Sequence, residues 1–200
     1  MNYKLENLER AAQLEAEENW AELLKFSMSW SADEPYNLFA WQAKGDSLRK
    51  LNQPGEAISA FLKGLEVAPQ KPLDFLGKPL TAGPLWYRLG QTYSDTERMK
   101  EAVEAFQCAA AADPEVTTIW NDLGVACTKI DDYKGAFVAF KKAVILNPSN
   151  TNSLRNLGVV YALCGVNDGV RKIYEMLLQL EGTVARDFMA TANRLLSEKK

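Results

Sequence analysis

The sequence contains no histidine. Histidine is the usual general base near neutral pH and the commonest metal ligand, and most serine and cysteine catalytic triads depend on it. Paired carboxylates such as Asp131-Asp132 lie near predicted turns or helix starts, where acids favour the helix dipole. No glycine-rich phosphate loop follows a strand, because the sequence predicts no strand. We therefore expect no enzyme, no metal and no other cofactor.

Cysteine is scarce. The three residues Cys108, Cys127 and Cys164 are odd in number and widely spaced, so they indicate neither a disulfide framework nor a zinc site. We expect all three to be small buried residues in a reducing compartment.

Long apolar runs and concentrated positive charge are also missing. The N-terminus lacks an apolar run of signal-peptide length, and no window approaches the ~20 apolar residues of a membrane helix. The formal net charge is -3 with both signs interleaved, so no basic surface for nucleic acid is expected. These absences predict a cytoplasmic protein that neither inserts into a membrane nor binds nucleic acid.

What the sequence does contain is one pattern that occurs twice, thirty-four residues apart. The first copy reads Trp86-x-x-Leu89-Gly90-x-x-Tyr93, then Ala102, Phe106, Ala109 and Pro114. The second reads Trp120-x-x-Leu123-Gly124-x-x-Cys127, then Ala136, Phe140, Ala143 and Pro148. A period of this length is typical of stacked helical hairpins.

The pattern closely resembles the tetratricopeptide repeat (TPR) family. The resemblance implies an all-α fold, a right-handed α-solenoid of stacked antiparallel helix pairs with a C-terminal capping helix. Residues 1–200 would form one solenoid, with these parts: a degenerate repeat at 4–37, repeats at 38–71, 83–116 and 117–150, a divergent repeat at 151–184 and the capping helix at 185–198. The recurring helix glycines, such as Gly90 and Gly124, predict close approach of paired helices.

Two segments depart from the pattern, and each has two interpretations. The degenerate repeat has Trp20, Phe26, Met28 and Trp30, which form either core or an exposed apolar docking patch. An insertion at 72–82 separates the repeats that end at 71 and begin at 83. Its apolar side chains either pack between hairpins or contact a partner: Leu73, Phe75, Leu76 and Leu80.

The resemblance also implies a concave groove lined by the first helix of each repeat. Transferred position by position, the groove residues we expect to bind a peptide are Phe39, Gln42, Asp46, Arg49, Tyr87, Arg88, Gln91, Asn121, Asp122, Lys129, Arg155 and Asn156. Further groove positions are occupied by Asp95, Val125, Thr128, Asn152 and Val159. The amide side chains suit recognition of a peptide backbone, because each both donates and accepts.

One ligand of the resembling family is excluded by these residues. Chaperone-binding members grip a C-terminal carboxylate with lysine, asparagine and arginine at fixed groove positions. The corresponding residues here are Gln42, Asp46, Arg88, Thr118 and Asp122, or Tyr87, Gln91, Asp122, Asn152 and Asn156. Asp122 would repel a carboxylate in either set, so we expect no chaperone-tail binding of this type.

The sequence thus predicts a protein-interaction scaffold or adaptor that binds a peptide segment of a protein partner in its groove. A self-assembling structural protein, and hence a homo-oligomer, is one alternative. A dedicated chaperone or escort for a secreted or membrane-associated client is another.

Overall fold

The computed structural model describes residues 5–69, 73–75 and 78–198. Within these residues the chain forms helical hairpins, as the repeat pattern predicts, and it divides into two compact units, Met1–Asp113 and Pro114–Lys200. The all-α solenoid of paired helices is confirmed.

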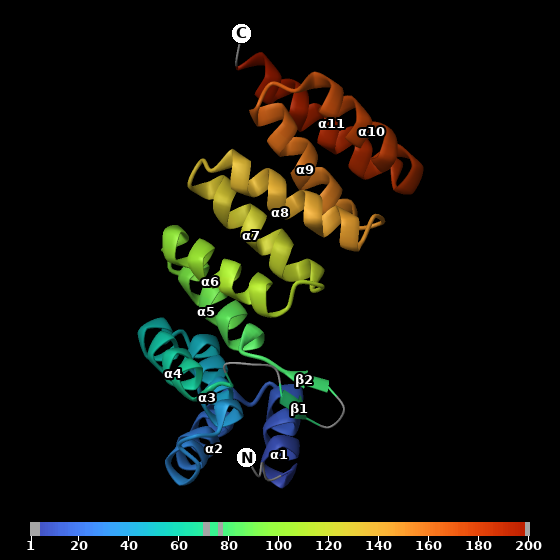
Figure 1. Ribbon diagram of the computed structural model, residues 1–200. Helices are drawn as coiled ribbons and strands as arrows, with labels where there is room; N and C mark the ends of the chain where they lie inside the picture. The colour runs from blue at the N-terminus through green and yellow to red at the C-terminus, as the bar shows by residue number, and fades with distance from the viewer. Residues whose placement is uncertain (1–4, 70–72, 76–77, 199–200) are drawn as a thin grey trace. The chain divides into compact units, whose positions relative to one another are not determined.

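The first unit contains three helical hairpins. Their helices are α1 (Leu5–Ala16) and α2 (Trp20–Asp33), α3 (Leu38–Lys50) and α4 (Pro54–Val67), and α5 (Gly83–Asp95) and α6 (Met99–Ala112). Each pair packs together, and α2 also contacts α3, as α4 contacts α5 (Figure 1). The first helices α3 and α5 also touch, so their facing side chains can meet.

The turn inside each hairpin has the same backbone conformation at the same place. The residues with positive φ are Glu18, Asn52, Glu97, Asp131 and Gly165, one in each helix-to-helix turn. Left-handed geometry is uncommon outside glycine, so its recurrence identifies one shared turn type. The degenerate segment at the N-terminus therefore folds as a hairpin of the same kind as the others.

Aromatic residues of that N-terminal hairpin belong mainly to its core. Trp30 is 3% exposed and packs with Leu14 and Leu23, while Phe26 contacts the same cluster and lies 5.6 Å from the Trp30 ring. Met28 is exposed. The alternative of an aromatic docking patch is wrong for Trp30, because helix periodicity turns this residue toward α1 and α3.

The insertion forms a short β-hairpin, contrary to the expectation of an irregular loop without strands. Strand β1 (Leu73–Phe75) pairs antiparallel with β2 (Lys78–Leu80), with Leu73 opposite Leu80. Three-residue strands are too short for alternation to be read, and a proline inside a run argues against a strand except at a sheet edge. The expectation of no strand was therefore wrong at this place.

The second unit contains two hairpins and a final helix. Its helices are α7 (Thr117–Lys129), α8 (Tyr133–Leu146), α9 (Thr151–Leu163), α10 (Asn167–Leu180) and α11 (Gly182–Ser197). Helix α11 packs on both α9 and α10 (Figure 1). Its Phe188 is completely buried. A Cβ added to Gly124 of α7 would lie 2.6 Å from the Phe140 ring of α8, so this glycine permits the close helix approach that the sequence predicts.

The cysteines differ from the prediction. Cys127 is 1% exposed, and burial raises the pKa of its thiol to about 11. Cys108 and Cys164, however, are exposed. Cys108 lies on the outer face of α6, whose Phe106 and Ala109 point inward, and Cys164 follows the last residue of α9.

Candidate functional site

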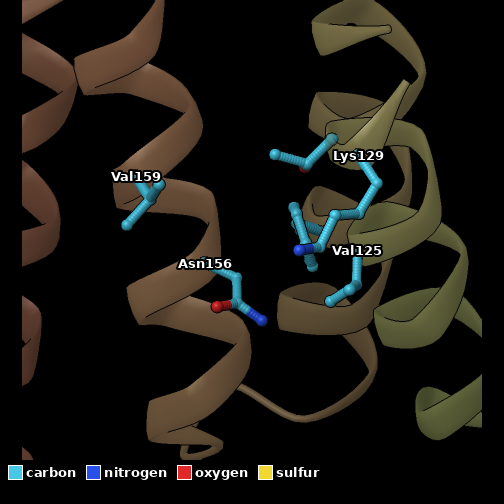
Figure 2. A pocket seen from close by; sticks show the side chains of 6 residues that line it. Val125, Lys129, Asn156 and Val159 are labelled. Carbon is cyan, nitrogen blue, oxygen red and sulfur yellow. The ribbon is translucent and has the colours of Figure 1, made fainter. Parts of the chain in front are cut away.

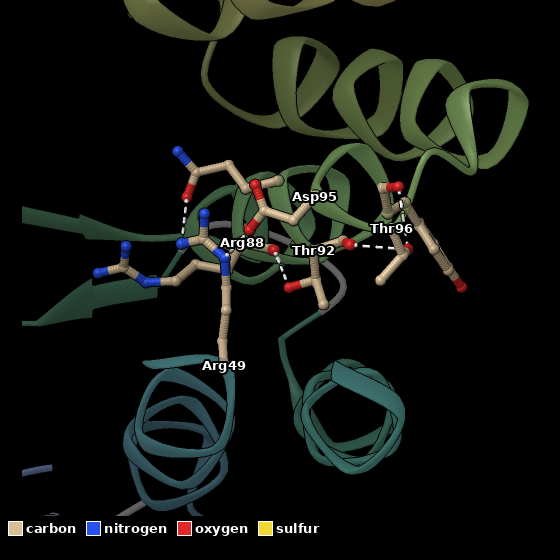
Figure 3. A network of polar contacts seen from close by, with 7 residues as sticks. Arg49, Arg88, Thr92, Asp95 and Thr96 are labelled. Atoms are coloured by element: carbon tan, nitrogen blue, oxygen red, sulfur yellow. Dashed lines mark hydrogen bonds and ion pairs between the residues drawn. The ribbon is translucent and has the colours of Figure 1, made fainter. Parts of the chain in front are cut away.

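The predicted groove residues of the first unit pair with one another. Arg49 on α3 donates from Nε to Asp95 Oδ2 at 2.7 Å and from Nη1 to Gln91 Oε1 at 3.2 Å (Figure 3). A second ion pair joins the same two helices, because Arg88 Nε on α5 lies 2.7 Å from Asp46 Oδ2 on α3. Charged side chains that could recognise a ligand therefore join two helices of the protein itself.

Asp46 carries the most perturbed carboxyl group of this network. The residue is 7% exposed, and burial raises its pKa to about 7, against the lowering effect of Arg88. Glu15 on α1 raises the pKa further, while Arg49 and Lys50 lower it. The Arg88 N–H does not point at the carboxylate, so the pair is a close charge contact without an aligned hydrogen bond. Burial without an aligned donor is the physical reason for the raised pKa.

The insertion contacts the same wall of the first unit. Phe75 of β1 lies with its ring 5.4 Å from that of Phe39 on α3, and Leu80 is buried in a cluster with Leu38 and Leu85. Leu76 lies outside the described residues, as does the side chain of Leu73.

Two further predicted groove residues of this unit are half-buried. Gln42 lies on α3, and Tyr87 on α5 has its ring 5.8 Å from that of Phe106. Contacts within the unit thus occupy most of its predicted groove residues.

In the second unit, two predicted groove amides bond to each other and, among the residues described, keep some of their hydrogen-bonding groups unused. Asn156 Nδ2 on α9 donates to Asn121 Oδ1 on α7 at 3.2 Å, and Ser153 Oγ approaches the same oxygen at 3.5 Å. In the described part of the chain, no hydrogen bond uses the amide nitrogen of Asn121 or the amide oxygen of Asn156. This amide pair therefore offers one donor and one acceptor side by side.

A pocket of ≈ 180 Å³ lies beside these amides, between α7, α8 and α9 (Figure 2). Its lining residues are Val125, Thr128, Lys129, Phe140, Asn156 and Val159. In Figure 2 the side chains of Lys129 and Asn156 both extend into the space between their helices. Five of the six lining residues were expected at groove positions. Phe140 was expected only as a position of the repeat pattern.

Charge around the pocket is positive at two exposed side chains. Lys129 and Arg155 are exposed, and no carboxylate of the described residues forms an ion pair with either. Asp122 on α7 is half-buried. The second unit therefore keeps two cations available, whereas the first unit pairs Arg49 and Arg88.

The sequence does contain a signal for the paired network of the first unit. Asp46 and Arg88 occupy groove positions of consecutive repeats with opposite charge, as do Arg49 and Asp95. Opposite charges on facing first helices favour pairing within the protein. The sequence does not indicate that Phe140 lines a pocket, because phenylalanine occupies the same position in the repeats at 38–71, 83–116 and 117–150.

No group of three or more Cys, Asp or Glu side chains in the described ranges is arranged to hold a metal ion. Nor does any described helix combine the length and apolar character needed to cross a membrane.

Solved structures with the same fold support this architecture. "Crystal structure of MamA" superposes with a TM-score of 0.74 at 16% identity, over 93% of this chain and 99% of that one. "Crystal structure of YrrB: a TPR protein with an unusual peptide-binding site" gives 0.72 at 17% identity, over 90% and 89%. "MamA 41-end from Desulfovibrio magneticus RS-1" gives 0.72 at 19% identity, over 88% and 94%. At these identities the likeness shows the fold alone.

Among curated proteins, no sequence matches this chain. Family models described as "Tetratricopeptide repeat" match residues 40–71 and 87–162, which together make up more than half of the chain. These ranges contain three glycine–phenylalanine pairs that set close helix approach, Gly45 with Phe61, Gly90 with Phe106 and Gly124 with Phe140. The chain belongs to the tetratricopeptide repeat family.

Proposed function

We propose that this protein is an interaction scaffold that binds an extended segment of a protein partner along α7 and α9. Proteins of this family are generally scaffolds without enzymatic activity, which supports the broad class. The observation that carries the finer proposal is the amide pair Asn121–Asn156, whose remaining donor and acceptor match the N–H and C=O groups of a peptide backbone.

The contrast with the first unit supports the same location. There, Arg49 and Arg88 are held by Asp95 and Asp46, so a ligand would have to displace contacts that already exist. On α7 and α9 the corresponding wall has a pocket and two cations, Lys129 and Arg155, that form no ion pair with any described residue. Binding at this wall breaks fewer contacts within the protein.

Site-specific photocrosslinking tests the proposal. A photoreactive amino acid would replace Asn152, which is exposed at the start of α9 on the predicted groove face. The matched control replaces Val138, which is 61% exposed on the outer face of α8. We expect a partner in native cells to crosslink at position 152 and not at position 138. Crosslinking at 138 alone would contradict the groove.

The same experiment separates the alternatives. A self-assembling protein would crosslink to its own chain, and light scattering would show a mass that rises with concentration. An escort protein would crosslink to one client, whereas a scaffold for a common peptide motif would crosslink to several.

A further inference from the structure

The pocket beside Asn156 has the size of one apolar side chain. Its volume is ≈ 180 Å³. A cavity of roughly 150 Å³ with apolar walls is large enough to bind a benzene molecule. Val125 and Val159 form facing apolar walls (Figure 2), and Phe140, which is only 2% exposed, adds an apolar ring to the lining. Leucine, isoleucine or phenylalanine fits this space, and a charged side chain would lose its hydration there.

The edge of the pocket favours negative charge. Lys129 lines the pocket itself, on the α7 turn that follows Val125, and its ammonium group has no acidic partner among the described residues. Arg155, adjacent to Asn156 on α9, adds a second exposed cation without such a partner. A carboxylate bound here would gain both charges without breaking an ion pair.

The spacing of apolar and cationic groups defines a peptide pattern. Val125 and Lys129 are four residues apart on one helix, a rise of about 6 Å. In an extended peptide, residues two positions apart point to the same side and lie about 7 Å from each other. A peptide with its apolar side chain in the pocket would therefore bring an acidic side chain two positions away close to Lys129.

We infer that the segment bound by α7 and α9 is an internal, extended stretch of a partner protein in which leucine, isoleucine or phenylalanine lies two positions from aspartate or glutamate. This inference rests on the proposed function and names the chemistry of its ligand. The carboxylate belongs to a side chain because the residue set for a terminal carboxylate is missing, with Asp122, Asn152 and Asn156 in its place. The Asn121–Asn156 pair binds the backbone between the two anchoring side chains.

Selection from a peptide library tests the pattern. The library displays random nonapeptides between fixed flanking residues, so that no variable segment has a free carboxyl end, and the full chain is the bait. We expect enrichment of peptides with one leucine, isoleucine or phenylalanine two positions from aspartate or glutamate. An enriched peptide, synthesised with blocked ends, should bind about tenfold more weakly after its apolar residue is changed to alanine. Changing its acid to the amide should weaken binding about threefold to tenfold.

Variants of the protein test which of its residues recognises the acidic and which the apolar residue of the peptide. Lys129→Glu should weaken binding of the acidic peptide. In the library it should shift the preference at the acidic position to lysine or arginine. Val159→Trp should fill the pocket and remove the preference for an apolar residue. Lys141→Glu is the matched control, because it makes the same charge change at an exposed position of α8 away from the pocket. It should leave both preferences unchanged, and circular dichroism confirms that each variant is folded.

Retention of the acidic preference by Lys129→Glu would overturn the inference, as would enrichment of peptides without the pattern or a requirement for a free carboxyl terminus. In each of these cases a partner crosslinked at position 152 would still uphold the proposed function. If no peptide is enriched and nothing crosslinks at position 152, both proposals fail.

Discussion

Ionisation of Asp46 is expected to destabilise the first unit as the pH rises. The pKa of this carboxyl group is about 7 in the folded protein, against 3.8 as its ordinary value. Between these two values the unfolded chain has released its proton while the folded chain still holds it. The folded state then binds more protons, so the free energy of unfolding falls with increasing pH. Below both pKa values, or above both, the group contributes no further change.

The size of the effect follows from the difference in pKa. Each unit of pKa is worth about 1.4 kcal/mol. About two of these pKa units lie above pH 5, because the folded pKa is about 7. The free energy of unfolding should therefore fall by roughly 3 kcal/mol between about pH 5 and about pH 8. This is a large share of the ~5–15 kcal/mol that typically separates folded from unfolded domains.

Urea unfolding of Asp46→Asn beside the unmodified protein measures this contribution. The amide keeps the shape of the protonated carboxyl group and does not titrate, so its unfolding free energy should lack the decline of about 3 kcal/mol between about pH 5 and pH 8. Tryptophan fluorescence suits the assay, because Trp20, Trp30, Trp41 and Trp86 lie in the first unit and only Trp120 lies in the second.

Asp95→Asn is the matched control. Asp95 also pairs with an arginine at 2.7 Å, but its side chain is 54% exposed, so its removal should change stability by less than about 1 kcal/mol. Parallel pH curves for the unmodified protein and Asp46→Asn would refute the reasoning, since burial would then not control this carboxyl group.

Three further changes test the packing. Gly124→Ala places a methyl group against the Phe140 ring and should cost about 1–3 kcal/mol, seen as a lower melting temperature by circular dichroism; an unchanged melting temperature would mean that α7 and α8 separate easily. Glu97→Gly relieves a left-handed residue at φ 59 and should raise stability by about 0.5–1 kcal/mol, and a loss of stability would argue against strain in this turn. Phe75→Ala removes the ring beside Phe39 and should lower the first unit's urea midpoint by the equivalent of about 1–2 kcal/mol; no shift would mean that the insertion contributes little to packing.

The hairpin framework could be predicted because each repeat position has one packing role. Gly124 and Phe140 occur at fixed spacing, and the glycine must be small wherever the phenylalanine ring fills the layer between helices. The same requirement operates at Gly45 with Phe61 and at Gly90 with Phe106, so a thirty-four-residue period locates helices α5 to α9 within a few residues. Local steric demands of this kind are visible in a single sequence.

The use of the groove positions could not be predicted in the same way. The repeat pattern puts Arg49 and Lys129 on the same wall of their repeats. Arg49 forms a hydrogen-bonded ion pair, whereas Lys129 forms none within the part of the chain that the structure describes. The difference depends on which residues face them from the next first helix, Asp95 and Gln91 in one case and an apolar surface with Val159 in the other. Such pairing depends on distances between helices, which the period does not specify.

The left-handed residue inside each hairpin also limits where this chain tolerates added length. Glu18 and Asn52 are thirty-four residues apart, as are Glu97, Asp131 and Gly165, whereas Asn52 and Glu97 are forty-five apart. The extra residues between Asn52 and Glu97 lie after α4 and before α5, outside every turn that joins the two helices of a pair. A residue added within a turn would move the left-handed position out of place, but a residue added between hairpins leaves both turns intact. For an affinity tag or a fluorescent reporter, the connection between α8 and α9 is accordingly a suitable insertion point, and the turn at Asp131 is not.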